Sequence, residues 1–188
     1  MSCQHMIDGL INHFVRSKQK MKSQKILKNI AFLVVLLANI GCDQISKNIA
    51  RKELSDYERI SFIKNHFTFT KVENTGAFLS VGSALPEFLK FFLLSIIPLL
   101  ALSYGIVYLF RKQNLTVVSA LALSFAIGGG IGNIYDRIIH GSVTDFMHID
   151  FGFFETGIFN MADVSIMVGM LLFLVQSYFK KEAGNVQH

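Results

Sequence analysis

Four apolar stretches alternate with polar segments along the chain, at about residues 28–43, 87–110, 115–135 and 158–179. An α-helix rises 1.5 Å per residue, so about 20 apolar residues can cross a hydrocarbon core about 30 Å thick. In the second stretch no charged residue interrupts residues 91–110, and Pro98 is a candidate position for a kink. The pattern predicts four transmembrane helices.

The basic residues lie mostly at alternate ends of these stretches. Residues 1–29 hold six Lys or Arg against one acid, Asp8, and basic pairs follow the second and fourth stretches at 111–112 and 180–181. Segments rich in Lys and Arg stay on the cytoplasmic side. We therefore expect both termini to be cytoplasmic, and we interpret the net charge of +5 as a topology signal and not as a nucleic-acid site.

One membrane domain accounts for most of the chain. We expect a cytoplasmic N-terminal extension at 1–27, a four-helix membrane domain at 28–181 and a cytoplasmic tail at 182–188. The outer segment 48–87 contains two stretches of alternating or nearly alternating polarity, at 60–63 and 67–70, which are typical of short strands. The expected fold is an all-α membrane protein of four transmembrane helices, with a small sheet on the outer side between the first and second.

The first apolar stretch also has features of a cleaved secretory signal. A basic flank and an apolar core precede Asn39-Ile40-Gly41-Cys42, which is similar to a lipoprotein cleavage box. Asn39 stands where such a box has Leu, and three further spans follow. A membrane span is therefore the better interpretation. Cys3 and Cys42 lie far apart and indicate neither a disulfide framework nor a metal site.

Polar residues gather where the predicted spans meet the outer surface. With both termini inside, the first and third spans end at the outer face, and the second and fourth begin there. Helical spacing of three or four residues places Asn133 with Asp136 and Arg137 on one face, and Asn160 with Asp163 on another. Topology alone thus predicts one polar pocket at the outer rim, formed by Asp43, Asn74, Asn133, Asp136, Arg137, Asp145, Asn160 and Asp163.

The acids of this pocket suggest general acid–base chemistry on a water molecule. Carboxylates near a membrane are costly and therefore indicate function. Two adjacent carboxyl groups share one proton, so the ionised member can deprotonate water while the protonated member polarises a carbonyl. This chemistry needs no metal or cofactor. The pattern does not say which aspartate is the base.

At these residues the chain resembles bacterial lipoprotein signal peptidase, also called signal peptidase II. The resemblance covers about residues 28–179 and keeps the family's order. Its motifs are Asp43-Gln44-Ile45-Ser46-Lys47, Asn74-Thr75-Gly76-Ala77, the glycine run 128–132 with Asn133-Ile134-Tyr135-Asp136-Arg137, Val143-Thr144-Asp145-Phe146, and Phe159-Asn160-Met161-Ala162-Asp163.

The resemblance implies a membrane aspartic endopeptidase of the bacterial inner membrane, with its site near the outer face. Such enzymes remove the signal peptide from diacylglyceryl-modified prolipoproteins, just before the lipidated cysteine. Asp145 and Asp163 would form the catalytic dyad, residues 48–87 an outer β-cradle with a short helix, and the partners would be substrate and membrane lipid, with the enzyme a monomer. The implied supporting polar residues are Asp43, Lys47, Asn74, Asn133, Asp136, Arg137 and Asn160.

Two features depart from the family pattern. Phe78-Leu79 follows the Asn74 motif where the family continues with Ala-Phe, and the segment before Met21 precedes the family's usual core. The alternative functions are a small transporter or proton channel and a non-enzymatic scaffold. The acids cluster at one face, which disfavours a channel, and a scaffold leaves them unexplained. The spacing of His140, Asp145, His148 and Asp150 matches no standard zinc signature, and no Gly-x-Gly-Asp motif of presenilin-like proteases is present.

Overall fold

The computed structural model describes residues 3–56, 58–63, 66–77, 82, 84–112 and 115–185. The chain divides into two compact units, Met1–Val34 and Val35–His188. The first unit is helical from Cys3 onward and carries exposed basic side chains, among them Arg16 and Lys25. Phe78 and Leu79, where the sequence departs from the family pattern, lie outside the described residues. So do the last three residues of the predicted tail.

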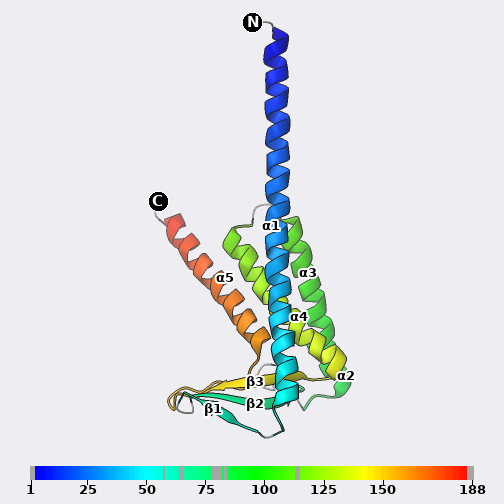
Figure 1. Ribbon diagram of the computed structural model, residues 1–188, viewed down its shortest axis with the longest axis vertical. Helices are drawn as coiled ribbons and strands as arrows, with labels where there is room; N and C mark the ends of the chain where they lie inside the picture. The colour runs from blue at the N-terminus through cyan, green and yellow to red at the C-terminus, as the bar shows by residue number, and fades with distance from the viewer. Residues whose placement is uncertain are drawn as a thin grey trace. The chain divides into compact units, whose positions relative to one another are not determined.

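Helices make up most of the chain (Figure 1). They are α1 (Cys3–Glu53), α2 (Glu87–Phe91), the π-helical turn η2 (Phe92–Ile96), α3 (Ile97–Arg111), α4 (Val117–His140) and α5 (Met161–Asn185). Among the described residues, four helical segments are long and apolar enough to cross a membrane: Ser23–Glu53, Glu87–Arg111, Val117–His140 and Met161–Lys180. The prediction of four spans is confirmed, and the protein is a multi-pass membrane protein.

The first span continues further than the sequence pattern predicted. We expected Asp43 to end it, which is wrong, because α1 runs to Glu53. Residues 44–53 contain neither Gly nor Pro, so nothing in the backbone stops the helix there. Beyond Asp43, Ala50 and then Leu54, just past the helix end, pack in an apolar cluster with Phe146 and Met147. Asp43 and Lys47 consequently lie within the helix.

The second span changes its helical geometry just before its proline. The turn Phe92–Ile96 is π-helical, and Pro98 follows in the first turn of α3. Proline has no backbone N–H and its ring collides with the carbonyl four residues earlier, which here belongs to Leu94. A wider turn accommodates that collision, so the expected irregularity at Pro98 takes the form of a π-helical turn.

A three-stranded antiparallel sheet lies at one end of the helices of the second unit (Figure 1). The strands are β1 (Ile60–Phe62), β2 (Phe67–Asn74) and β3 (Val143–Ile149), in the order β1-β2-β3. The two strands between the first and second spans are confirmed. Asp145, which follows the third apolar stretch, lies on β3 and not in a loop. The first five residues of β3 are all buried, so its sequence lacks the alternation that marks a half-exposed strand.

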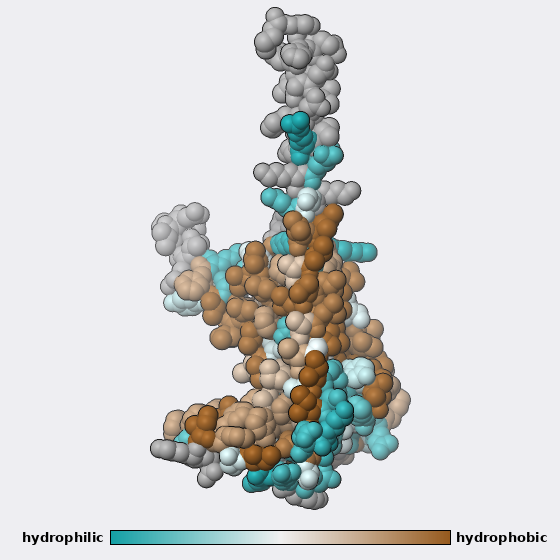
Figure 2. All heavy atoms as spheres, in the orientation of Figure 1, coloured by the Kyte–Doolittle hydropathy of each residue, from teal (hydrophilic) through white to brown (hydrophobic). Residues whose placement is uncertain are grey.

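The second unit has a polar interior and an apolar exterior. Its fully buried large side chains include Lys47, Asn160, Thr144, Asp43 and Asp136. Figure 2 shows apolar residues over the helices of this unit and polar residues gathered toward the end where the sheet lies. This arrangement suits a solvent of lipid chains, in which the outward surface must be apolar and polar groups must find partners inside.

Glycines of α4 allow its neighbours to approach closely. A Cβ at Gly128 would lie 2.9 Å from Asn39 Cβ, and a Cβ at Gly132 would collide with the Asp43 carboxylate, both on α1. A Cβ at Gly129 would collide with the carbonyl oxygen of Ala162 on α5. Gly128 and Gly132 are small residues four positions apart on α4, and both allow close packing of helices within one chain.

We predict that Gly132→Ala destabilises the protein, because the added methyl must displace the buried Asp43 carboxylate. Overpacking of this kind costs about 1–3 kcal/mol. The matched control is Gly41→Ala on α1, where an added Cβ meets nothing within 4 Å. Thermal unfolding in detergent should show a lower Tm for Gly132→Ala and an equal or higher Tm for Gly41→Ala. Equal Tm values for the two variants would contradict this packing.

Candidate active site

Two acids and two bases form a buried ion cluster between α1 and α4. Lys47 Nζ lies 2.8 Å from Asp43 Oδ2 and 3.0 Å from Asp136 Oδ2, and all three side chains are fully buried. Arg51 Nη2 lies 2.9 Å from Asp136 Oδ1. Two positive charges thus face two negative ones, so the cluster is neutral as a whole. The i,i+4 pair of Asp43 and Lys47 expected from the sequence is confirmed.

The cluster joins three helices. The backbone N–H of Ala162, at the start of α5, donates to Asp43 Oδ1 at 2.8 Å. Gln44 Nε2 donates to Asp43 Oδ2 at 3.0 Å and to Asp136 Oδ1 at 3.2 Å. Removing an ion from water costs several kcal/mol, and such a cost is recovered only when every partner is in place. The geometry of α1, α4 and α5 is therefore tightly coupled to these ions.

Asn160 and Asp163 form a reciprocal cap at the start of α5. The Asp163 N–H donates to Asn160 Oδ1 at 3.0 Å, and the Asn160 N–H donates to Asp163 Oδ2 at 3.1 Å. This is the geometry of a capping box, with Asp163 in the first helical turn. The positive end of the helix dipole favours a negative charge at that position. The cap therefore fixes the direction of the Asp163 carboxylate.

Asp145 lies on β3 and is 4% exposed. Its Oδ2 accepts a hydrogen bond from Asn74 Nδ2 at 3.0 Å, and its Oδ1 accepts one from Asn160 Nδ2 at 2.6 Å. Burial is the main cause that raises the pKa of Asp145 to about 6; the hydrogen bond from Asn74 opposes it, and the negative charge of Asp163 adds to it. Asp145 thus holds a proton more readily than an ordinary aspartate.

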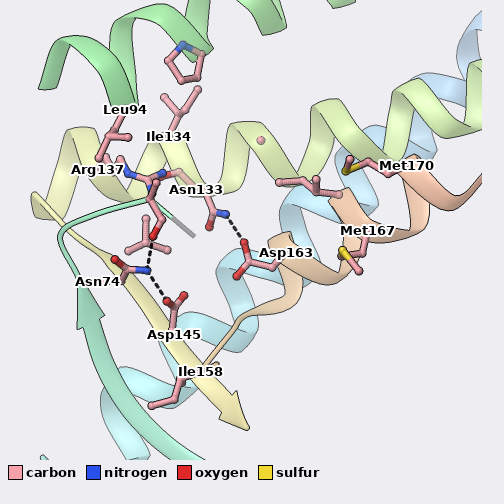
Figure 3. Close-up of a pocket in the computed structure, with 15 residues that line it drawn as sticks. Asn74, Leu94, Asn133, Ile134, Arg137, Asp145, Ile158, Asp163, Met167 and Met170 are labelled. Carbon is pink, nitrogen blue, oxygen red and sulfur yellow. Dashed lines mark hydrogen bonds between the residues drawn. The ribbon is translucent and has the colours of Figure 1, made fainter. Parts of the chain in front are cut away.

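Asn160 bridges the two carboxyl groups, since its side chain donates to Asp145 and its backbone N–H donates to Asp163. Asn133 Nδ2 also donates to Asp163 Oδ1 at 2.9 Å (Figure 3). Both aspartates border a cavity of about 460 Å³ whose other walls are largely apolar. The cavity is lined by Asn74, Ala77, Leu94, Pro98, Gly130, Asn133, Ile134, Arg137, Val143, Asp145, Ile158, Asp163, Ile166, Met167 and Met170.

Arg137 points into this cavity region and away from Asp136. Asp136 forms ion pairs with Lys47 and Arg51 and not with its neighbour Arg137. Adjacent residues on a helix do not face each other. Arg137 Nη2 instead donates to the Gly76 carbonyl at 2.9 Å, which fixes the loop after Asn74. Among the described residues, its buried Nε has no hydrogen-bond partner.

The residues that the sequence placed in one pocket, together with the supporting residue Lys47, separate into two groups. Asn74, Asn133, Arg137, Asp145 and Asp163 line the cavity, whereas Asp43, Lys47, Asp136 and Asn160 lie buried behind it. The sequence analysis missed three residues that bind the second group, namely Gln44, Arg51 and Thr144. It also missed Glu73, which accepts a hydrogen bond from Thr144. Arg51 could have been assigned to the ion cluster if the helix had been known to continue, because it lies four residues after Lys47 and therefore on the same helix face.

A group of possible metal ligands lies at the end of β3 and on the hairpin that follows it. Ligand atoms of His148, Asp150 and Glu155 lie within 4.8 Å of one another, and Glu155 is exposed. Asp145 is not a member, so the four-residue metal site considered from the sequence is not the group that the fold assembles. Exposed acidic groups of this kind are common without a metal, and we assign this one no role.

Two carboxyl groups held by shared amide donors, one of them buried and prone to protonation, have the composition of an acid–base pair. The half-open cavity beside them offers space for a substrate with apolar parts. Neutral amide donors surround the pair, so either carboxyl can be ionised without losing its hydrogen bonds. The arrangement is suited to activating a water molecule against a carbonyl group.

We predict that the carboxyl of Asp145 titrates with a midpoint near pH 6 in the free protein. It is protonated below that pH and ionised above it, because burial disfavours its charge. Infrared difference spectra between pH 4 and 8 should show a protonated-carboxyl band that Asp145→Asn abolishes. Asn74→Ala should move the midpoint upward, because its amide favours the ionised form. A midpoint near 4 in the unsubstituted protein would contradict this account.

Comparison with known proteins places the chain in one family. The model of the family described as "Signal peptidase (SPase) II" matches residues 7–179. The lipoprotein signal peptidase of Clostridium acetobutylicum is 31% identical over 157 residues, which cover 82% of this chain and 99% of that protein. The lipoprotein signal peptidase of Aquifex aeolicus is 33% identical over 163 residues, covering 86% and 91%.

Solved structures agree on the fold. A bacterial membrane enzyme determined by the in meso method at 2.3 Å resolution aligns with a TM-score of 0.71 and 22% identity, covering 82% of this chain and 90% of that one. A second such enzyme, at 1.9 Å, aligns with a TM-score of 0.66 and 23% identity. With the family model matched over most of its length, the chain belongs to the signal peptidase (SPase) II family.

Proposed function

We propose that this protein removes the signal peptide from diacylglyceryl-modified prolipoproteins, cutting before the lipidated cysteine. Its relatives bear the name lipoprotein signal peptidase, which supports this substrate class. The single observation that carries the chemistry is Asn160, which donates hydrogen bonds to both Asp145 and Asp163. A pair of carboxyl groups held at one amide is what an aspartic peptidase requires.

The two aspartates take different roles in the proposed reaction. Asp163, at the positive end of α5, is the ionised base that removes a proton from water. Asp145 is the protonated member and donates its proton to the carbonyl oxygen as the water oxygen bonds to the carbonyl carbon. This gives a tetrahedral diol, and Asp163 then protonates the departing nitrogen. Asp145 recovers its proton as the carbonyl re-forms and the peptide C–N bond breaks.

The apolar surroundings of Asp163 support a substrate that carries lipid. Besides the cavity that holds both aspartates, a second cavity of about 450 Å³ borders Asp163 and has an almost wholly apolar lining. It is lined by Ile149, Thr156, Gly157, Ile158, Phe159, Asp163, Val164, Met167, Val168 and Leu171. A signal-peptide segment and acyl chains both need apolar contacts, and two apolar cavities that meet at Asp163 offer them on either side of the scissile bond.

The proposed topology places this site at the outer face of the bacterial inner membrane, with both termini in the cytoplasm. The support is the distribution of basic residues: Arg111, Lys112 and Lys180 lie at the helix ends away from the sheet. The contacts of Gly128 and Gly132 are met within one chain, which supports a monomer. No metal or other cofactor takes part in the proposed reaction.

We predict that Asp145→Asn and Asp163→Asn each abolish cleavage, because neither amide can exchange the proton. The purified protein in detergent would be given a diacylglyceryl-modified prolipoprotein beside its unmodified precursor, and cleavage would be followed by gel shift. The unsubstituted enzyme should cut the lipidated form only. Asp150→Asn, on the hairpin after β3, is the matched control and should keep its activity.

Substantial activity in either dyad variant would exclude the two-carboxylate mechanism. Absence of cleavage by well-folded unsubstituted protein would exclude the proposed function itself, and ion flux through vesicles would then test the transporter alternative. A metal chelator should leave the rate unchanged. Strong inhibition by a chelator would point instead to a metal-dependent reaction.

A further inference from the structure

The side chain of Asn133 lies between a buried cation and one of the two aspartates. Its Oδ1 accepts a hydrogen bond from Lys47 Nζ at 2.8 Å, and its Nδ2 donates to Asp163 Oδ1 at 2.9 Å. Asn160 Nδ2 also donates to Asn133 Oδ1, at 3.2 Å. A single amide thus connects the ion cluster to the carboxylate that borders the cavity.

Lys47 is held in one position by its surroundings. An ammonium group has three hydrogens and no acceptor, and Lys47 Nζ has three acceptors, at Asp43, Asn133 and Asp136. The side chain is fully buried, so water cannot replace any of these partners. The ammonium therefore presents a fixed donor to Asn133.

That donor determines which end of the Asn133 amide faces Asp163. An amide has an oxygen at one end and an NH₂ at the other, and an ammonium can bind only the oxygen. The opposite rotamer would place NH₂ against the ammonium and oxygen against the carboxylate, so that both contacts would be repulsive. Lys47 thereby aims Asn133 Nδ2 at Asp163.

We propose that Lys47 is a positioning residue of the peptidase reaction, which acts through Asn133 to hold the Asp163 carboxylate oriented toward the attacking water. The inference rests on the proposed function. Lys47 itself is behind the cavity wall and does not line the cavity. Its hydrogen-bonded connection to Asp163 runs from Asn133 Nδ2 to Asp163 Oδ1. Its charge also acts on Asp145, whose pKa it lowers.

Arg51 provides a matched comparison within the same cluster. It also pairs with Asp136, but its other described contact is Thr144 Oγ1, at 2.8 Å, and not Asn133. Loss of either cation removes one positive charge from beside Asp136. Only the loss of Lys47 removes a donor from Asn133 Oδ1, which then keeps Asn160 Nδ2 alone, so the two variants separate a structural role from a positioning role.

Charge balance gives a variant that should fold without Lys47. In Lys47→Met with Asp43→Asn, one positive and one negative charge disappear together, and the ion pair of Arg51 with Asp136 remains. Its control is Asp43→Asn alone, in which Lys47 still has Asn133 and Asp136 as partners. Both proteins lack the Asp43 carboxylate, and only the double variant lacks the ammonium that donates to Asn133.

The test has two readouts: the side-chain amide NMR signals of Asn133 in ¹⁵N-labelled protein in detergent, assigned with Asn133→Ala, and kcat and KM for a lipidated prolipoprotein. In Lys47→Met/Asp43→Asn, Asn133 Oδ1 loses the ammonium donor and keeps the donor from Asn160. The two N–H signals of the Asn133 amide should therefore shift and broaden.

Lys47→Met/Asp43→Asn should also lose about tenfold or more in kcat, with KM little changed. Asp43→Asn and Arg51→Met should keep the original Asn133 signals, even where their folded yield falls. Unmoved Asn133 signals without Lys47, or an equal shift in Arg51→Met, would overturn the positioning role. The NMR readout does not depend on cleavage, so failure of the unsubstituted enzyme to cut the substrate would count against the proposed function alone.

Discussion

The neutral cluster of Asp43, Lys47, Asp136 and Arg51 is the interaction on which the rest of the structure depends. Burying four ions in a membrane domain is costly unless every charge has a partner, so the cluster forms only when α1, α4 and the start of α5 are in register. Gly132 contributes by leaving room for the Asp43 carboxylate. The cluster thus performs the role that an apolar core performs in a soluble domain, in a protein whose outward surface is apolar.

Hydrogen bonds of neutral side-chain amides connect this cluster to the cavity. Lys47 binds Asn133, Asn133 binds Asp163, and Asn160 binds Asp163 and Asp145. The sheet supplies the other side, because β3 carries Asp145, and Met147 on that strand pairs with Phe159 just before Asn160. Two carboxyl groups from different elements therefore meet at one residue. Burial raises the pKa of Asp145, and a helix N-terminus favours charge on Asp163, which supports the proposed roles of acid for Asp145 and base for Asp163.

The four spans could be predicted from the sequence, because apolar stretches of membrane length are a local pattern. The polar residues that lie together could also be predicted, because the number of spans decides which span ends share one face of the membrane. The sequence did not allow prediction of β3, since a strand buried on both faces lacks alternation. It also misplaced the end of the first helix, and with it Arg51. An ion pair between Asp136 and Arg137 could have been excluded from the sequence, because immediate neighbours on a helix do not face each other. The network through Asn133 depends on side-chain distances that no local pattern carries.

The central claim is that Asp145 holds the shared proton while Asp163 acts as the base. The most direct test is the pH dependence of kcat/KM for cleavage of a lipidated prolipoprotein, which reports protonation in the free enzyme. If Asp145 must be protonated, kcat/KM should fall about tenfold per pH unit above about pH 6, in line with the raised pKa of Asp145. A rate that instead rises through pH 6 and stays high would mean that Asp145 works ionised, and would contradict the assignment.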